Sequence, residues 1–401
     1  MPVIHLPENV SHPVLIQSLA ENGALQDDWE RTDVDFPPHC FIDQAAIAFL
    51  CEWAMLHQGQ GRRVGFYGDE NTLRYLSRLD VFQHTDFAYA EHFERYPEAG
   101  RFIPARLITD DDDVFEANNV ICDLVLRQFD NAQEFLPAME WAVYEIIDNI
   151  RLHSNTPVPG VLTAQYYPQR YRLDIAIVDA GRGIMASLSE SQHLWSHGDA
   201  ITKAIQRGVT RNPDVGQGNG MAGTCEIVRL NGGELHVWTG DVDFTVRGGR
   251  DRGFRKIPEV AGTGIFLRLD TRHSVCLSDT FISDPGWSYI NYEAERLVEV
   301  GGIRIADECV HTGGREPART LRRKIETLLN ELDGSLILDF DGVTFATSSF
   351  FDELLGRLAG AIGAENLGQR IHIINLSQNL CAMANVTIEQ RLDRVGVDLS
   401  N

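Results

Sequence analysis

Two polar side chains spaced four residues apart, Glu145 and Asn149, are of types that can bind a hard metal ion. In a helix they would lie one turn above each other, with Asp148 beside them on the polar side. Carboxylate and carboxamide oxygens are ligands that suit Mg2+ rather than zinc or iron. The pair could therefore hold a magnesium ion and a water together, or it could simply be the polar face of a surface helix.

The surrounding sequence predicts the elements that would position this pair. Apolar residues recur at steps of three and four over residues 139–150, which is the pattern of an amphipathic helix with one buried face. After a Pro/Gly break, Arg172–Val178 reads as a strand, and it leads into Asp179-Ala-Gly181-Arg-Gly183. An acid followed by two glycines is expected where the chain turns tightly.

The pattern Glu145-x-x-x-Asn149, followed by Asp179-x-Gly181-x-Gly183, resembles the N box and first glycine box of one ATPase superfamily. This is the superfamily of gyrase, Hsp90, histidine kinases and MutL (GHKL). Its members share a two-layer α/β sandwich, the Bergerat fold. The resemblance implies that fold for the central part of this chain.

Two further stretches agree with that resemblance. Residues 216–221 (GQGNGM), followed by a helix, resemble the glycine-rich ATP lid, and Gly262-Thr263-Gly264 resembles the terminal Gly-Thr box that closes the adenine pocket. Four boxes in the right order are a far more specific signal than any one of them.

The resemblance also implies a role for each matched residue. Asn149 would be a ligand of the Mg2+ that accompanies ATP, and Glu145 would polarise a water or a hydroxyl for attack on the γ-phosphoryl group. Asp179 would accept a hydrogen bond from the adenine amino group, which guanine lacks at that position. The other residues assigned to nucleotide binding are Gly181, Gly183, Ile184, Gly218, Asn219, Gly220, Met221 and Thr263.

Residues 218–223 also spell G-x-G-x-x-G, and Asp241 follows about twenty residues later, as in a dinucleotide-binding fingerprint. That fingerprint must follow a strand directly, whereas residues 211–217 are polar, contain proline and read as a loop. We therefore favour main-chain N–H groups at a helix N-terminus that hold phosphates, as in an ATP lid.

The order of predicted elements indicates an α/β protein with three regions. Residues 1–109 alternate strands and helices and loosely resemble a STAS-type domain, the module of anti-anti-sigma factors. Residues 110–273 carry the four ATPase boxes. Residues 274–401 have a β-α-β-α order, and the stretch 339–358 (DFDGVTFATSSFFDELLGRL) resembles the core of STAS-like domains.

One serine in that stretch, Ser348, aligns with the serine that anti-sigma kinases phosphorylate. The sequence departs from the pattern on both sides, because Thr347 stands where those proteins usually carry an acid and Phe350 where they carry glycine. Ser348 also lies where a hydroxyl would cap the following helix. Phosphorylation and capping are therefore alternative roles for Ser348.

Charge and composition argue against several classes of protein. A formal net charge of −23 disfavours a broad nucleic-acid or anionic-membrane surface, with Arg247–Lys256 as the one basic stretch. No stretch reaches the roughly 18 apolar residues of a membrane span, and no secretory signal is visible. Seven cysteines are scattered without a C-x-x-C pair, which predicts a reduced cytoplasmic protein without a zinc site.

The resemblance implies an ATP- and Mg2+-binding regulatory protein and leaves three mechanisms open. In the first, ATP switches contacts with the STAS-like domain, a protein partner or a second copy, with slow hydrolysis by Glu145. In the second, the protein is an anti-sigma-type serine/threonine kinase whose acceptor is Ser348 or a partner's serine. In the third, it is a nucleotide-gated interaction module without catalysis. The presence of Glu145 favours the first two, so an ATPase is the first expectation.

Overall fold

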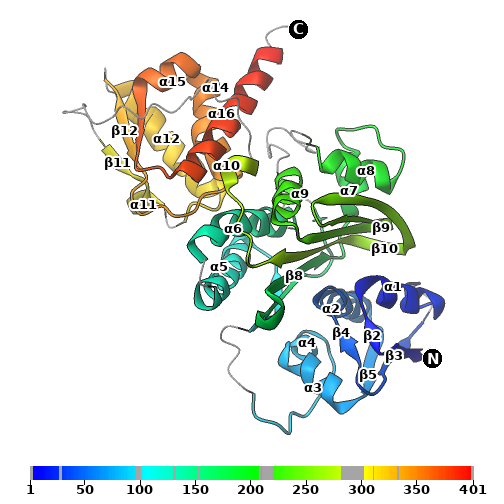
Figure 1. Cartoon of the computed structure of the whole chain (residues 1–401). Coiled ribbons are helices and arrows are strands. Elements are labelled where there is room, and N and C mark those ends of the chain that lie inside the picture. Colours follow the sequence, from blue (N-terminus) through cyan, green and yellow to red (C-terminus); the bar gives the residue numbers. More distant parts are fainter. Residues whose placement is uncertain are drawn as a thin grey trace. The chain divides into compact units, whose positions relative to one another are not determined.

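The computed structural model is an α/β protein, as the sequence predicts, and its described residues divide into two compact units (Figure 1). Unit 1 comprises residues 1–136, 146–205 and 228–274, and unit 2 comprises residues 137–145, 206–227 and 275–401. No helix of the described part is long and apolar enough to cross a bilayer. The structure describes residues 3–26, 29–95, 101–129, 132–150, 154–206, 209, 220–280, 302–309, 311–331 and 334–398.

Unit 1 begins with a parallel three-stranded sheet in the order β1-β3-β5, beside a short parallel pair, β2 and β4. Four helices flank these strands. The strands are β1 (Val3–His5), β2 (Asn9–Val10), β3 (Arg31–Phe36), β4 (Phe41–Ile42) and β5 (Arg63–Gly68), and the helices are α1 (His12–Glu21), α2 (Gln44–Gly59), α3 (Glu70–Arg78) and α4 (Val81–His84).

Helix α2 joins this N-terminal part to the larger sheet of unit 1. The carboxylate of Asp43 caps it by accepting a hydrogen bond from Ala46 N at 2.8 Å. Of its 16 residues, 13 are buried, and a helix that is apolar on all sides must be covered on all sides. It packs against β7 and β8 of the second sheet, so the two parts of unit 1 share one hydrophobic core.

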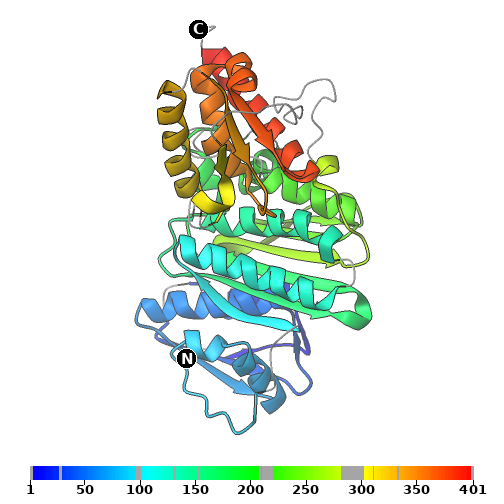
Figure 2. The ribbon, with the colours of Figure 1, turned by 90° about the vertical axis from the view of Figure 1, so that its left-hand side faces the viewer.

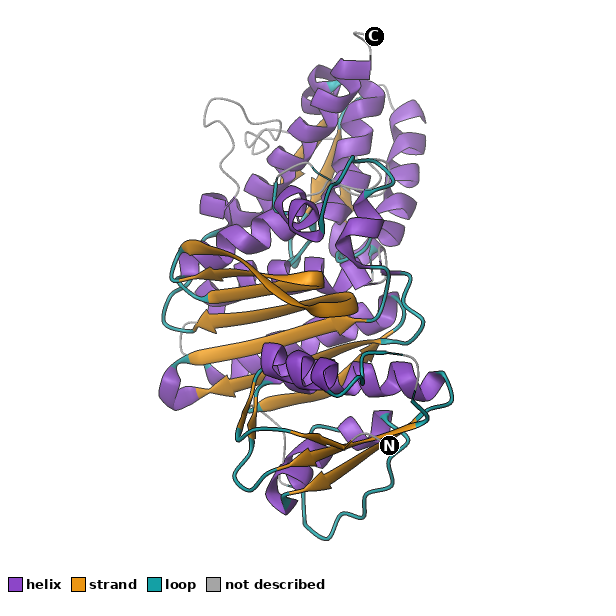
Figure 3. Ribbon diagram, turned by 90° about the vertical axis from the view of Figure 1, so that its right-hand side faces the viewer, coloured by secondary structure: helices purple, strands orange, loops and turns teal. Residues whose placement is uncertain are grey.

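The second sheet of unit 1 has five antiparallel strands in the order β6-β7-β8-β10-β9 (Figure 3). Its central strand, β8, is buried on both faces. Ala176 and Val178 belong to the core shared with α2, and the alternate residues Ile175 and Ile177 face the other way. The strands are β6 (Phe102–Ile108), β7 (Gly160–Tyr167), β8 (Arg172–Asp179), β9 (Glu234–Arg247) and β10 (Arg250–Asp270).

Residues 240–258 continue β9 and β10 as a long hairpin, although this stretch of sequence is polar and rich in glycine. The hairpin bends where Gly240 has φ +56° and where the pairing register shifts near Val260. The bend brings the tip of the hairpin back to the start of β9, because Gly248 N donates a hydrogen bond to Gly233 O at 3.0 Å. The outer part of the hairpin faces solvent, so its polar residues and glycines do not form the apolar pattern that predicts a strand.

Five helices follow or interrupt the second sheet: α5 (Asp111–Gln128), α6 (Ala132–Asn149), α7 (Gly183–Leu188), α8 (His197–Ala204) and α9 (Gly220–Asn231). The run of four acidic residues at 110–113 forms the cap and the first turn of α5. Asp110 and Asp113 form a reciprocal capping box there. The apolar stripe predicted over residues 139–150 lies in α6 and in the residue that follows it, and its members are buried.

Unit 2 contains a parallel three-stranded sheet in the order β11-β12-β13, with helices packed around it (Figure 2). A single π-helical turn over Asp352–Gly356 joins α13 to α14. The elements are α10 (Leu277–Thr280), β11 (Gly302–Arg304), α11 (Ile305–Glu308), α12 (Arg315–Glu331), β12 (Leu336–Asp339), α13 (Ser348–Phe351), α14 (Arg357–Ile362), α15 (Ala364–Arg370), β13 (Ile371–Ile374) and α16 (Gln378–Asp398).

A buried charge fastens α12 and α16 to that π-helical turn. Asp352 is fully buried and accepts hydrogen bonds from Arg315 at 2.9 Å and from Arg391 at 2.6 Å. Removing one partner from a buried pair of this kind costs about 3–5 kcal/mol, because the other charge is left uncompensated. The cluster therefore fixes how these three helical segments pack.

Candidate functional site

Glu145 and Asn149, the pair expected near the phosphates of ATP, lie near the end of α6. Glu145 and Asn149 are both half-buried, and Asn149 is the last residue of the helix. Glu145 approaches the start of α9 within unit 2, since a β-carbon on Gly220 would lie 2.7 Å from Glu145 Oε2. Gly220 and Met221 are the first residues of α9, whereas the predicted lid residues Gly218 and Asn219 lie outside the described residues.

A buried corner of unit 1 gathers the residues that follow β8. Asp179 is the last residue of β8 and is 6% exposed, and its Oδ1 accepts a hydrogen bond from Gly181 N at 2.8 Å. Thr263 on β10 pairs with Asp179 in the sheet, and its main-chain N–H also bonds to the Asp179 side chain. Two motifs far apart in the sequence thus meet at one carboxylate.

Glycine is required at three positions of this corner because the backbones approach closely. A β-carbon on Gly181 would overlap the carbonyl group of Ser154, and one on Gly262 would overlap the carbonyl group of Asp179. Gly262 and Gly183 also have φ values of +71° and +75°, which favour glycine. The glycines predicted as a nucleotide contact therefore leave room for nothing larger than hydrogen.

Sequence reasoning missed Thr239, which completes the corner from β9. Its Oγ1 donates to Gly262 O at 2.8 Å and accepts from Ile184 N at 3.3 Å. Thr239 is fully buried and pairs with Thr263, so one row of residues crosses β8, β10 and β9. The only signal in the sequence is its place directly after the largely apolar residues 235–238 (LHVW).

Sequence reasoning also missed the contribution of Ser154. Its main-chain oxygen accepts a hydrogen bond from Arg182 N at 2.8 Å and lies against Gly181. The segment that follows α6 is thereby tied to the turn after β8. The neighbouring residues 151–153, including His153, lie outside the described residues.

Burial controls the charge of this corner. Desolvation raises the pKa of Asp179 to about 7, against the opposing effect of the hydrogen bonds from Gly181 and Thr263. Desolvation also raises the pKa of Glu52 on α2 well above its usual range, and the charge of Asp179 adds to that rise. A donor group that reached Asp179 would favour its charged form.

The predicted phosphoacceptor Ser348 is the first residue of α13. The cap of this helix is Thr347 rather than Ser348, because Phe350 N donates to Thr347 Oγ1 at 3.0 Å. Thr347 is fully buried, and its hydroxyl also donates to Gly313 O at 3.0 Å. The capping role left open for Ser348 therefore belongs to its neighbour.

Residues 318–380 match the family model of a STAS-like domain of unknown function (DUF4325). This segment is a STAS-like domain. It runs from α12 into α16 and includes β12, β13 and Ser348, which confirms the STAS-like character predicted for this part of the chain. No curated protein matches the chain.

The raised pKa of Asp179 predicts a specific pH dependence of stability. The folded state holds this proton more tightly than the unfolded state, so the contribution of Asp179 to stability is present below about pH 4 and is lost as the pH rises to about 7. Asp179→Asn removes the ionisation. We therefore expect the free energy of unfolding of Asp179→Asn minus that of the wild type, measured with urea, to be larger at pH 8 than at pH 5.

Asp123→Asn on the exposed surface of α5 is the matched control, and its stability relative to the wild type should change little between the two pH values. Glu52 shifts stability in the same direction as Asp179. Because the charge of Asp179 adds to the raised pKa of Glu52, that pKa is raised less in Asp179→Asn, which changes the comparison in the same direction. A difference between Asp179→Asn and wild type that is constant with pH would contradict a raised pKa at Asp179.

Proposed function

We propose that the protein is an ATP- and Mg2+-binding regulator whose nucleotide state changes the contacts of its STAS-like domain or of a partner protein, with slow ATP hydrolysis. One observation carries the proposal. The Asp179 turn and the Gly262-Thr263 stretch, which resemble two boxes of the GHKL superfamily, meet at a single buried carboxylate. A Bergerat-type ATPase domain over residues 110–273 is part of the proposal.

The chemistry of the corner fits an adenine ring. Asp179 offers carboxylate oxygens at the end of a buried strand, where the adenine amino group could donate to them. The close approach at Gly181 and Gly262 packs the turn after β8 against the backbone of Ser154 and of β10, which holds the Asp179 carboxylate in place. Gly183, Ile184 and Thr263 would complete the contact with the base.

The residues assigned to the phosphates are compatible with the same ligand. Asn149 would supply an oxygen to Mg2+, Glu145 would orient a water, and the main-chain N–H groups of Gly220 and Met221 open a helix of 12 residues. Gly218 and Asn219 would belong to the lid. When bound, Mg2+ would neutralise negative charge that develops on the phosphates.

The STAS-like match over residues 318–380 supports a regulatory role, because the resemblance implies a module of the kind found in anti-anti-sigma factors. Nucleotide state would act on the contacts of this domain.

Calorimetric titration of ATP with Mg2+ into the full chain tests the proposal. Binding should be saturable, and Asn149→Ala should weaken it at least tenfold when Mg2+ is present, because it removes a metal ligand. Asn366→Ala, at an exposed position of α15, is the matched control and should bind as the wild type does. No binding at millimolar ATP would contradict the proposal.

Release of phosphate separates catalysis from simple gating. Glu145→Ala should lower turnover by about 10²–10⁴-fold while ATP still binds, because a general base is lost. Glu134→Ala, at an exposed position of the same helix, should leave turnover unchanged. Unchanged turnover in Glu145→Ala would contradict the role of Glu145.

The match to a STAS-like domain over Ser348 favours a second candidate, a serine/threonine protein kinase of the anti-sigma type. In that case label from the γ-phosphate of ATP would appear on protein rather than as free phosphate. Self-labelling that is lost in Ser348→Ala but kept in Ser349→Ala would place the acceptor at Ser348. An absence of label transfer, together with phosphate release, would favour the ATPase.

A further inference from the structure

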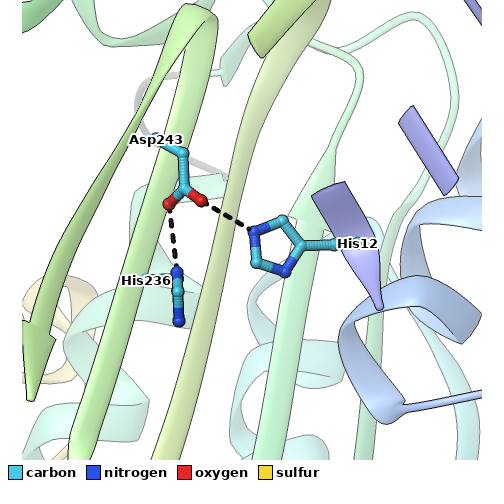
Figure 4. A group of neighbouring side chains, drawn as sticks. All are labelled: His12, His236 and Asp243. Carbon is cyan, nitrogen blue, oxygen red and sulfur yellow. Dashed lines mark hydrogen bonds and ion pairs between the residues drawn. The ribbon is translucent and has the colours of Figure 1, made fainter. Parts of the chain in front are cut away.

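Three side chains that no part of the proposed function uses converge on the other face of the second sheet of unit 1. They are His12, the first residue of α1, His236 on β9, and Asp243 beyond the bend of the hairpin (Figure 4). His12 Nε2 lies 3.2 Å from Asp243 Oδ2, and His236 Nδ1 lies 3.1 Å from Asp243 Oδ1. The ligand atoms of all three lie within 4.8 Å of one another.

The fold brings these residues together by the bend at Gly240. Seven residues of straight strand would separate His236 and Asp243 by about 23 Å. The side chains instead touch, because the outer half of the hairpin returns over the inner half. His12 lies 231 residues from Asp243 in the sequence and arrives with α1, which packs on β10.

Both imidazole rings are held by neighbours outside the cluster. The His12 ring stacks on Trp238, with ring centroids 4.2 Å apart and planes 14° apart. His236 turns Nε2 toward Glu234 Oε1 at 3.2 Å, and Glu234 is held by Arg268 at 2.8 Å. Metal-binding histidines are oriented in this way, with the second ring nitrogen donating to a carboxylate.

We propose that His12 Nε2, His236 Nδ1 and the Asp243 carboxylate form a binding site for a zinc-type divalent transition-metal ion. Two imidazole nitrogens and one carboxylate are a donor set that Zn2+ accepts. With bonds of 2.0–2.1 Å, tetrahedral ligand atoms lie about 3.3 Å apart, which is close to the two distances measured here. The site fastens α1 to the folded hairpin and is independent of the proposed nucleotide site.

The cation of Arg255 competes with the metal for the Asp243 carboxylate. Arg255 places its guanidinium 2.6 Å from Asp243 Oδ2, and Thr245 Oγ1 lies 3.2 Å from His236 Nδ1. The Arg255 side chain is 55% exposed, so it can move into solvent when a cation binds. This arrangement gives a test that distinguishes a metal site from a purely ionic contact between α1 and the hairpin. Removal of Arg255 would weaken an ionic contact but should strengthen metal binding.

The experiment is a titration of cobalt(II) into the full chain after removal of metals with a chelator, followed by visible absorption. We expect one ion per chain with the intense bands of tetrahedral cobalt and without thiolate charge transfer. Those bands should disappear in His12→Asn and in Asp243→Asn. Glu234→Gln should bind about 10–100-fold more weakly, as expected when a partner of a ligating histidine is lost.

Two exposed positions keep the test decisive if the buried variants fail to fold. His5→Asn removes a histidine that is 73% exposed and also lies against a carboxylate, and it should leave the spectrum unchanged. Arg255→Gln should bind cobalt severalfold more tightly than the wild type. The proposal is overturned by the absence of tetrahedral bands in the wild type, by thiolate bands, or by weaker binding in Arg255→Gln.

Discussion

The described fold of unit 1 depends on two buried carboxylates that β8 carries on its opposite faces. Asp174 is fully buried on the face that packs against the N-terminal part, and Arg268 of β10, its partner in the sheet, neutralises it. Asp179 ends the strand on the other face, where main-chain N–H groups stabilise it. A buried charge is tolerated only when it is paired or hydrogen-bonded, so both residues require β10 in this register. A slip of one residue would exchange the two faces and leave both charges without partners.

The two faces then acquire different chemistry. On one face, ionic partners continue from Asp174 through Arg268 to Glu234 and on to the histidine cluster proposed as a metal site. On the other face, the row that begins at Asp179 continues through threonines and close-packed glycines, and this row carries the nucleotide site proposed above. Strand β8 therefore holds the N-terminal part of unit 1 on one face and carries the candidate nucleotide site on the other.

Local patterns in the sequence predicted local structure well. The amphipathic stripe of α6 and the turn after β8 follow from side-chain periodicity and from glycine, both of which act over a few residues. The folded hairpin was missed because its bend depends on long-range pairing and its strands are polar. Asp179 and Thr263 were predicted by their motifs, whereas Thr239 carries no motif and His12 is far from its partners in the sequence. Such contacts are set by tertiary packing.

The proposed nucleotide site depends above all on a hydrogen bond from an adenine amino group to Asp179. The most direct measurement is equilibrium dialysis of radiolabelled ATP and GTP against the wild-type chain, each with Mg2+. Guanine presents an acceptor where adenine presents a donor to the Asp179 carboxylate. We therefore expect ATP to bind at least tenfold more tightly than GTP. Equal affinity for the two nucleotides would contradict the role of Asp179, even if both of them bound.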